Sequence, residues 1–496
     1  MDTNTALNDA RQRQWAGSFG LKHILQERLE ARLSTVQLAV TLADRECSAG
    51  GSMKMNRIKR WWSYDSEAEK NSADNPVAPL SADQRRGTGP LLTLAFGWGF
   101  LVTGLFVGGM LGSGQVFWPD IVAATFAGNV ANFVIGALVG YIGYRTACNS
   151  GLLYQLVYGK IGAFIPVLII ALLLIGWQGI VVGAFGVAWA GNMDSMSFYV
   201  VAILAGTLFT VTTYFGVKGL EWVSMPSVSV LVLVGLYSIW LNVDQAGGWT
   251  AFLDLSAARV AGADAPLTML KAVNIVIGSW IVGAIVMPEY TRFARKAWVA
   301  IAIPFIVMII AQWFLQVVGA LGGVVSGTFD FTVYLREQGP FIMYVGIIGM
   351  SLALWTTGDA NLYLPVIQTS SVLRRPQHVM TVICGALGTL VGLGIYQHFM
   401  DWIEFLASIV PPLIGPVIAH YYVVQKMRFE PRMLEHAPAW NPAAVVAYLM
   451  GAAAAIMNTN NILVSADSMV PALTGLLVSI IAYIVAALLG LASRPQ

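Results

Sequence analysis

A cluster of polar residues interrupts an apolar part of the chain at residues 355–361. It supplies an indole, two hydroxyls, an acid and an amide, from Trp355, Thr356, Thr357, Asp359 and Asn361. The apolar run that leads to it begins near residue 341, and polar groups at such a depth are costly in a bilayer unless they face a cavity or an ion. These residue types therefore indicate a binding site inside a membrane. Hydrogen bonding between neighbouring helices is the alternative role for the hydroxyls.

Two tryptophans flanked by glycine lie near the centres of other apolar segments. Trp177 stands between Gly176 and the pair Gln178-Gly179, and Trp280 follows Gly278-Ser279. Interfacial tryptophan is the commoner kind in membrane proteins, so two central indoles with open faces suggest a sandwich for a flat heterocycle. Stacking of a base on an aromatic ring contributes roughly 1–3 kcal/mol. Packing against neighbouring helices is the alternative.

The same cluster offers oxygens for a cation. Thr356 and Thr357 supply hydroxyls, and an unwound segment near residues 97–100 would supply backbone carbonyls. Such an oxygen set suits a hard monovalent ion. Asp359 is the one acid near the centre of its segment, where it would bind a proton, a cation or a substrate N–H, or form a hydrogen bond to a neighbouring helix.

The composition is that of a membrane protein. Of its 496 residues 57% are hydrophobic and 11% are charged, and the mean hydropathy is +0.69. A soluble domain has about 25% charged residues. The long apolar runs indicate an all-α, polytopic membrane protein. The net charge of +2 gives no reason to expect a nucleic-acid partner, and three cysteines without motif spacing give no metal site or disulfide framework.

No motif of an enzyme or of an ATP-driven pump is present. The chain has no His-Glu-x-x-His, no Gly-x-Ser-x-Gly in an apolar segment and no phosphate-binding loop. We therefore expect no enzyme activity and no organic cofactor, and uphill transport would use an ion gradient.

The N-terminal residues differ in composition from the rest. Residues 1–90 carry 13 of the 28 Lys and Arg residues and no apolar spanning segment. They are predicted to be a largely disordered cytoplasmic region, followed by a transmembrane domain at 91–496. Two interpretations of residues 1–52 stay open: they belong to the protein, or translation begins near Met53.

About twelve segments from residue 91 onward are long and apolar enough to span a bilayer, which takes about 20 residues. They are 91–115, 120–143, 163–190, 197–217, 222–242, 268–288, 297–321, 340–363, 378–396, 399–424, 441–458 and 469–491. With the N-terminus inside, the inner loops hold 11 Lys and Arg residues and the outer loops 3. This bias predicts that both termini are cytoplasmic and that the protein is a multi-pass protein of the plasma (inner) membrane.

Two of these segments contain backbone breakers at similar positions. The first contains Gly97-Trp98-Gly99, and the sixth contains Gly278-Ser279-Trp280 and then Pro288. Because they lie five segments apart, their orientations in the membrane are opposite. This predicts two inverted five-helix repeats, each with an unwound first helix that exposes backbone groups to ligands.

Charged residues mark the inner end of the sixth segment. Glu289 and Arg292 would form either a gating ion pair or a structural pair at the water boundary. In the tenth segment Pro411-Pro412 is predicted to break the helix, because proline lacks the N–H donor.

Together these residues resemble the nucleobase:cation symporter-1 family and, within it, bacterial cytosine and purine permeases. The strings that carry the resemblance span about residues 91–425. They are Gly108-Gly109-Met110-Leu111-Gly112-Ser113-Gly114, Gly140-Tyr141-Ile142-Gly143, Gly176-Trp177, Tyr214-Phe215-Gly216, Gly278-Ser279-Trp280, Arg292-Phe293-Ala294-Arg295, Trp355-Thr356-Thr357, Asp359 and Pro411-Pro412.

The resemblance implies a leucine-transporter-like fold, with two inverted five-helix repeats plus two C-terminal helices, and coupling to sodium or protons. By resemblance the cation ligands are the carbonyls of Gly97, Phe100 and Ala353 and the hydroxyls of Thr356 and Thr357. The substrate-binding residues that follow from the residues and the resemblance are Trp177, Gln178, Trp280, Asp359, Asn361 and Leu101.

The chain departs from the cytosine permease pattern at five positions, Leu101, Leu174, Gly358, Ala360 and Asn361. The resemblance therefore implies symport of a nucleobase or related planar N-heterocycle rather than of cytosine in particular. Two other hypotheses stay open: a transporter of another small solute on the same fold, and a nontransporting membrane sensor or scaffold. The sequence leaves the coupling ion and the oligomeric state undetermined.

Overall fold

The computed structural model describes residues 75–215, 217–330, 339–462 and 464–492. The chain divides into two compact units, residues 1–63 and residues 64–496. The first unit lies outside the described residues, as does most of the predicted N-terminal region 1–90, whose boundary stays a prediction.

The described part of the second unit is built from helices, and no strand occurs in it. Its first half contains α4 (Thr88–Gly99), α5 (Thr103–Met110), η1 (Leu111–Gln115), α6 (Trp118–Thr146), α7 (Ser150–Tyr158), α8 (Phe164–Ala190), α9 (Met196–Tyr214), α10 (Val217–Gln245) and α11 (Trp249–Ala261). Its second half contains α12 (Met269–Ile285), α13 (Pro288–Thr291), α14 (Ala297–Phe305), η2 (Ile306–Gln312), α15 (Trp313–Ser326), α17 (Pro340–Leu373) and α18 (Gln377–Gly392). The C-terminal part contains η3 (Ile395–His398), α19 (Phe399–Ile409), α20 (Pro411–Ala419), η4 (His420–Val424), α21 (Arg432–Glu435), α22 (Pro442–Thr459) and α23 (Pro471–Leu488).

These helices coincide with the twelve predicted segments, and α17 continues to Leu373 where the prediction ended at 363. By length and composition, eight helices among the described residues are able to cross a membrane, or nine when α4 and α5–η1 count as one bent span. The all-α prediction is confirmed, and the number of twelve spans stays a prediction.

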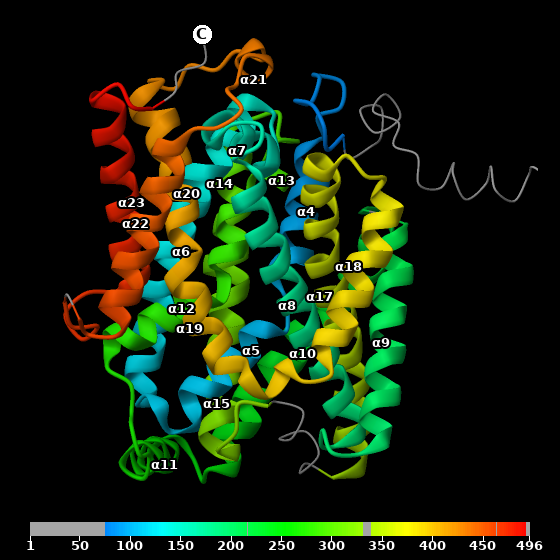
Figure 1. Cartoon of the computed structure of the whole chain (residues 1–496). Helices are drawn as coiled ribbons and strands as arrows, with labels where there is room; N and C mark the ends of the chain where they lie inside the picture. The colour runs from blue at the N-terminus through cyan, green and yellow to red at the C-terminus, as the bar shows by residue number, and fades with distance from the viewer. Residues whose placement is uncertain (1–74, 216, 331–338, 463, 493–496) are drawn as a thin grey trace, which may run out of the picture. The chain divides into compact units, whose positions relative to one another are not determined.

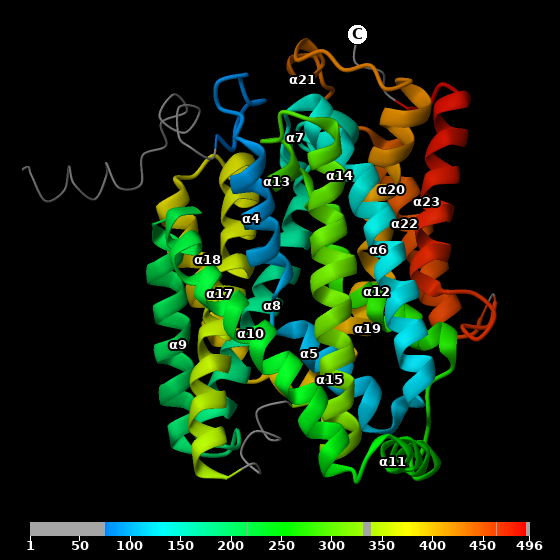
Figure 2. The ribbon, with the colours of Figure 1, turned by 180° about the vertical axis from the view of Figure 1, so that it is seen from behind.

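Short helices cover the two ends of the bundle. Figure 1 shows α7, α13 and α21 at the end where α4 begins and α23 ends, with α11 at the opposite end. Seen from both sides, α22 and α23 stand together at one edge and α9 and α18 at the other (Figures 1 and 2). The core between the edges contains α8, α12 and the α4–α5 pair, whose side chains are mostly buried.

The first span is broken as predicted. α4 and α5–η1 are bent by 41° across residues 100–102. Glycine favours the break here, because a glycine held in a helix loses more conformational entropy than any other residue. At Gly99 the absence of a side chain also allows close packing, because a Cβ would lie 2.8 Å from the Ala311 Cβ.

The second break lies elsewhere than expected. α12 runs without interruption through Gly278-Ser279-Trp280 and ends at Ile285, so the predicted unwinding at 278–280 is wrong. A Cβ on Gly278 would lie 2.5 Å from the carbonyl oxygen of Ile403 on α19, so this glycine serves close helix packing. The helix ends before Pro288, which begins α13 and has no N–H to continue α12.

The predicted break in the tenth segment is confirmed. α19 ends at Ile409 and α20 begins at Pro411, and proline at the first turn of a helix loses no hydrogen bond.

Candidate functional site

The break between α4 and α5 is a tight turn. The Leu101 N–H donates to the Gly99 carbonyl at 2.9 Å. Phe100 between them has φ −82° and ψ 56°, which are the dihedral angles of an inverse γ-turn. This turn ends α4 and redirects the chain into α5.

The turn leaves two carbonyls without their helical donors. In a continuous helix the N–H groups of Leu101 and Gly104 would bond to the carbonyls of Gly97 and Phe100. Here the Leu101 N–H donates to Gly99, and the Gly104 N–H donates to the Leu101 carbonyl at 3.2 Å. The carbonyls of Gly97 and Phe100, two of the predicted cation ligands, are therefore available to another partner.

The other three predicted ligands lie on α17, opposite the turn. The hydroxyls of Thr356 and Thr357 both donate to the Ala353 carbonyl, at 2.9 and 2.7 Å. The Val102 N–H, freed by the break, donates to Thr357 Oγ1 at 3.2 Å. This bond links α17, which carries three of the five predicted ligands, to the α4–α5 pair, which carries the other two; that these oxygens bind a cation stays a prediction.

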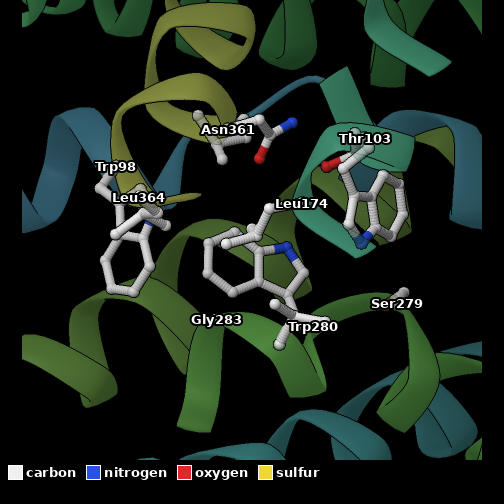
Figure 3. A pocket seen from close by; sticks show the side chains of 11 residues that line it. Trp98, Thr103, Leu174, Ser279, Trp280, Gly283, Asn361 and Leu364 are labelled. Atoms are coloured by element: carbon white, nitrogen blue, oxygen red, sulfur yellow. The ribbon is translucent and has the colours of Figure 1, made fainter. Parts of the chain in front are cut away.

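A cavity of about 30 Å³ lies beside the break, and it is shown in Figure 3. Helices α4, α5, α8, α12 and α17 and the break itself line it, through Trp98, Leu101, Thr103, Leu174, Trp177, Ser279, Trp280, Val282, Gly283, Asn361 and Leu364. Four of the six predicted substrate-binding residues are brought together here, namely Leu101, Trp177, Trp280 and Asn361.

Indole rings dominate the wall of the cavity. Trp98 and Trp280 pack edge to face, with centroids 5.4 Å apart and planes at 65°. Trp98 also lies 4.2 Å from the Tyr290 ring, and Trp177 packs edge to face on Phe399 at 6.1 Å. A cavity of this volume holds about one water-sized molecule, so a heterocycle fits only after the rings separate.

Two polar side chains of the wall are available to a ligand. Asn361 on α17 and Thr103 at the start of α5 are 8% and 5% exposed, and Figure 3 labels both. Neither has a hydrogen-bond partner for its side chain among the described residues. Ser279 differs, because its hydroxyl already donates to the Val276 carbonyl at 2.7 Å.

Gln178 points away from the cavity. It follows Trp177 and is therefore rotated by about 100° around the helix. It is fully buried against α18, where a Cβ on Gly388 would lie 2.6 Å from its Cγ. Its amide atoms have no partner among the described residues.

Asp359 is also separated from the cavity. Its carboxylate accepts hydrogen bonds from Thr212 at 2.6 Å and from Thr213 at 3.5 Å, both on α9. The second carboxylate oxygen has no partner within the described chain, although the residue is 1% exposed. Asp359 thus connects α17 to α9.

Sequence reasoning missed Trp98 and Thr103. Trp98 stands between Gly97 and Gly99, the same pattern that singled out Trp177 and Trp280. The same glycine pattern therefore marks Trp98 as a candidate for the wall of the cavity. Thr103 carries no comparable signal, because its position depends on where the break falls.

Glu289 and Arg292 are both buried, with 4% and 1% exposure, and their role as a gating or a structural pair stays a prediction. The Glu289 carboxylate accepts from the Ser150 N–H at the start of α7. Arg292 Nη1 donates to the Asn75 carbonyl at 2.8 Å. These bonds tie α13 to α7 and to the segment before α4.

Residues 75–87 form a segment that runs across this end of the bundle. Asn149 Nδ2 donates to the Pro76 carbonyl at 2.7 Å, and the Arg86 N–H donates to the Phe293 carbonyl at 2.9 Å. The segment thereby fastens the start of α4 to the α6–α7 and α13–α14 connections.

Comparison with known proteins identifies the family. Residues 83–486 match the family model described as permease for cytosine/purines, uracil, thiamine, allantoin. The chain belongs to this permease family. The resemblance is thereby confirmed, and the chain is a transport protein of the membrane and not an enzyme.

Two curated relatives illustrate the range of the family. The cytosine permease of Escherichia coli (strain K12) is 28% identical over 386 residues, which cover 78% of this chain and 89% of the relative. The hydantoin permease of Microbacterium maritypicum is 23% identical over 408 residues, covering 73% of this chain and 78% of the relative.

Solved structures share the fold of this permease. Mhp1, a nucleobase-cation-symport-1 family transporter in a closed conformation with bromovinylhydantoin bound, superposes with a TM-score of 0.69 at 19% identity, over 83% of this chain and 94% of Mhp1. A sodium-coupled sialic acid symporter reaches a TM-score of 0.61 at 14% identity, over 87% of this chain and 94% of that one. The leucine-transporter-like fold with two inverted five-helix repeats is confirmed.

Proposed function

We propose that this permease is a secondary active symporter that imports a nucleobase or a related planar N-heterocycle together with a cation by alternating access. The observation that carries the proposal is the cavity at the helix break. There the indoles of Trp98, Trp177 and Trp280 converge with the polar side chains of Asn361 and Thr103, which have no partner in the described part of the chain.

The wall of the cavity suits a flat, polar ring. Indole faces bind such a ring through stacking, which contributes roughly 1–3 kcal/mol per base. The carboxamide of Asn361 offers a donor and an acceptor, and the Thr103 hydroxyl offers both from one atom. A heterocycle with ring N–H and carbonyl groups at its edge would satisfy them, whereas an aliphatic solute would leave them without partners at a cost.

Cation binding and substrate binding share one structural element. The proposed cation ligands are the carbonyls of Gly97, Phe100 and Ala353 and the hydroxyls of Thr356 and Thr357. The last turn of α4 carries the Gly97 carbonyl, the γ-turn carries the Phe100 carbonyl, and the next residue, Leu101, lines the cavity. A cation held between this turn and α17 would fix the shape of the cavity wall, which is a direct route to coupling.

Sodium is the coupling ion that the neutral oxygen set favours, and a proton is the alternative if Asp359 takes part. We further propose that the protein lies in the plasma (inner) membrane with both termini in the cytoplasm, supported by the bias of 11 to 3 Lys and Arg residues between the predicted inner and outer loops.

Uptake into proteoliposomes tests the proposal. Purified protein is reconstituted, and entry of radiolabelled cytosine, uracil and hydantoin is measured with an inward sodium gradient, an inward proton gradient or neither. We expect saturable uptake of at least one heterocycle that depends on a cation gradient. Gradient-driven uptake of a radiolabelled amino acid included for comparison, with none of the three heterocycles taken up, would support another solute on the same fold, and no uptake of any solute would support the sensor or scaffold. Either result would overturn the proposal.

A further inference from the structure

Four buried amide side chains lie on α6 and on the helical stretch from η2 to α15. They come from α6, η2 and α15, and they are Asn129, Asn132, Gln312 and Gln316. All four are fully buried, and none of them lines the cavity. A fully buried amide in a membrane protein suggests a specific function, because its burial costs free energy when its hydrogen bonds are incomplete.

Gln312 alone among the four bonds to the helix break. Its Nε2 donates to the Gly99 carbonyl at 2.7 Å and to the Leu101 carbonyl at 3.3 Å. These two carbonyls flank Phe100, the centre of the γ-turn. One NH₂ group therefore joins the residues before and after the turn, as a clamp would.

The surrounding backbone restricts the position of the Gln312 amide. Gln312 is the last residue of the π-helical turn η2, which begins at Ile306 shortly after Pro304. A π turn accommodates an extra residue and rotates the side chains that follow it, and such turns are frequent at functional sites. The amide also needs the bare backbone of Gly104, because a Cβ there would lie 2.7 Å from Gln312 Oε1.

The other amides serve different contacts. Gln316, one turn further along, accepts a hydrogen bond from Asn129 Nδ2 at 2.6 Å. Asn132 Nδ2 donates to the Val276 and Ile277 carbonyls of α12 at 3.3 and 3.2 Å. Gln316 therefore provides a matched control: it has the same residue type, lies in the same helical stretch, is equally buried, and makes no bond to the break.

We propose that Gln312 is a positioning residue that holds the unwound segment in the geometry required for cation and substrate binding. By engaging the carbonyls on either side of Phe100, it keeps the Phe100 and Gly97 carbonyls free for the cation and keeps Leu101 at the cavity. The expected effect of Gln312 on transport rests on the proposed function. Its hydrogen bonds to the turn do not depend on that function.

Hydrogen–deuterium exchange tests the clamp without reference to transport. Gln312→Met keeps the length of the side chain and removes the donor, and Gln316→Met makes the same change at the control position. In purified protein we expect Gln312→Met to speed exchange in peptides that cover residues 97–104, and Gln316→Met to leave those peptides as in the wild type. Equal exchange there in both variants, or faster exchange spread over the whole chain in Gln312→Met alone, would overturn the proposal.

Uptake kinetics test the consequence, with radiolabelled cytosine as the probe. Gln312→Met should raise the sodium concentration for half-maximal uptake by about tenfold, the equivalent of one lost hydrogen bond to a strongly polar partner. Gln316→Met should leave that concentration unchanged. A purely structural role would lower the amount of folded protein, and hence the maximal rate, without moving the sodium dependence, and that result would also overturn the proposal.

Two further cases distinguish a failure of this proposal from a failure to fold and from a failure of the proposed function. If Gln312→Met does not fold, Gln312→Asn retains the amide but is one methylene too short to reach both carbonyls, and the same exchange pattern is expected. If the wild-type protein takes up no cytosine under any gradient, the proposed function fails for this probe, while the exchange experiment still decides whether Gln312 holds the turn.

Discussion

Replacement of Thr357 by valine tests the proposed cation site at a single oxygen. Valine has nearly the shape of threonine, so packing on α17 is preserved while the hydroxyl is lost. In the structure this hydroxyl is fully buried, donates to the Ala353 carbonyl at 2.7 Å and accepts the Val102 N–H at 3.2 Å. Hydrogen bonds to charged groups contribute about 1.5–3 kcal/mol. If an oxygen ligand of the cation is comparable, the half-maximal sodium concentration rises about 10- to 150-fold.

The assay is sodium-dependent uptake of the best heterocycle into proteoliposomes, with protein amount checked by size-exclusion chromatography. Thr357→Ser restores an oxygen and should recover most of the sodium affinity. Thr381→Val is the matched control, because Thr381 on α18 is also buried and, among the described residues, its hydroxyl bonds to the Gln377 carbonyl of its own helix. Wild-type sodium dependence in Thr357→Val, or an equal shift in Thr381→Val, would refute the reasoning.

Three further predictions follow from the site and its surroundings. Trp280→Ala should weaken substrate binding by about 5- to 150-fold, and Trp280→Phe far less, because only phenylalanine keeps a face for stacking; isothermal titration measures both, and an equal loss would return Trp280 to a packing role. Asp359→Asn should leave the KM for substrate unchanged, because its carboxylate bonds to α9 outside the cavity; a raised KM in uptake assays would contradict that assignment. Deletion of residues 1–52 should leave uptake at the wild-type rate, since the family match begins at residue 83; lost uptake by a variant that still inserts normally would show that the segment has a role.

Helical geometry explains which site residues the sequence located. Asn361 lies four residues after Thr357, so both occupy one face of α17, and the structure places them at the cavity and at the break. Asp359 lies two residues after Thr357, about 200° around the helix. That rotation directs it toward α9, and the same argument separates Gln178 from Trp177. The angular positions were therefore contained in the sequence for residues of one helix.

Glycines by themselves do not predict where a helix breaks. Around Gly97 and Gly99 the glycines do accompany a break, because the freed groups find partners on other elements: Thr357 for the Val102 N–H and Gln312 for the carbonyls. Gly278 accompanies no break. There the glycine lets α19 approach closely, and the helix hydrogen bonds continue.

The sequence by itself determined the membrane environment, the all-helical architecture, the family and four residues of the cavity. The membrane environment and the helices follow from composition and from apolar runs within single segments, whereas the family and the cavity residues follow from motifs and from the resemblance that they carry. Only the tertiary structure decided that Trp98 and Thr103 join the cavity, that Asp359 faces α9, and that Gln312 bonds to a turn more than 200 residues earlier in the chain. Their roles depend on which helices lie side by side. Packing between residues far apart in the sequence sets that arrangement, so local sequence patterns do not predict it.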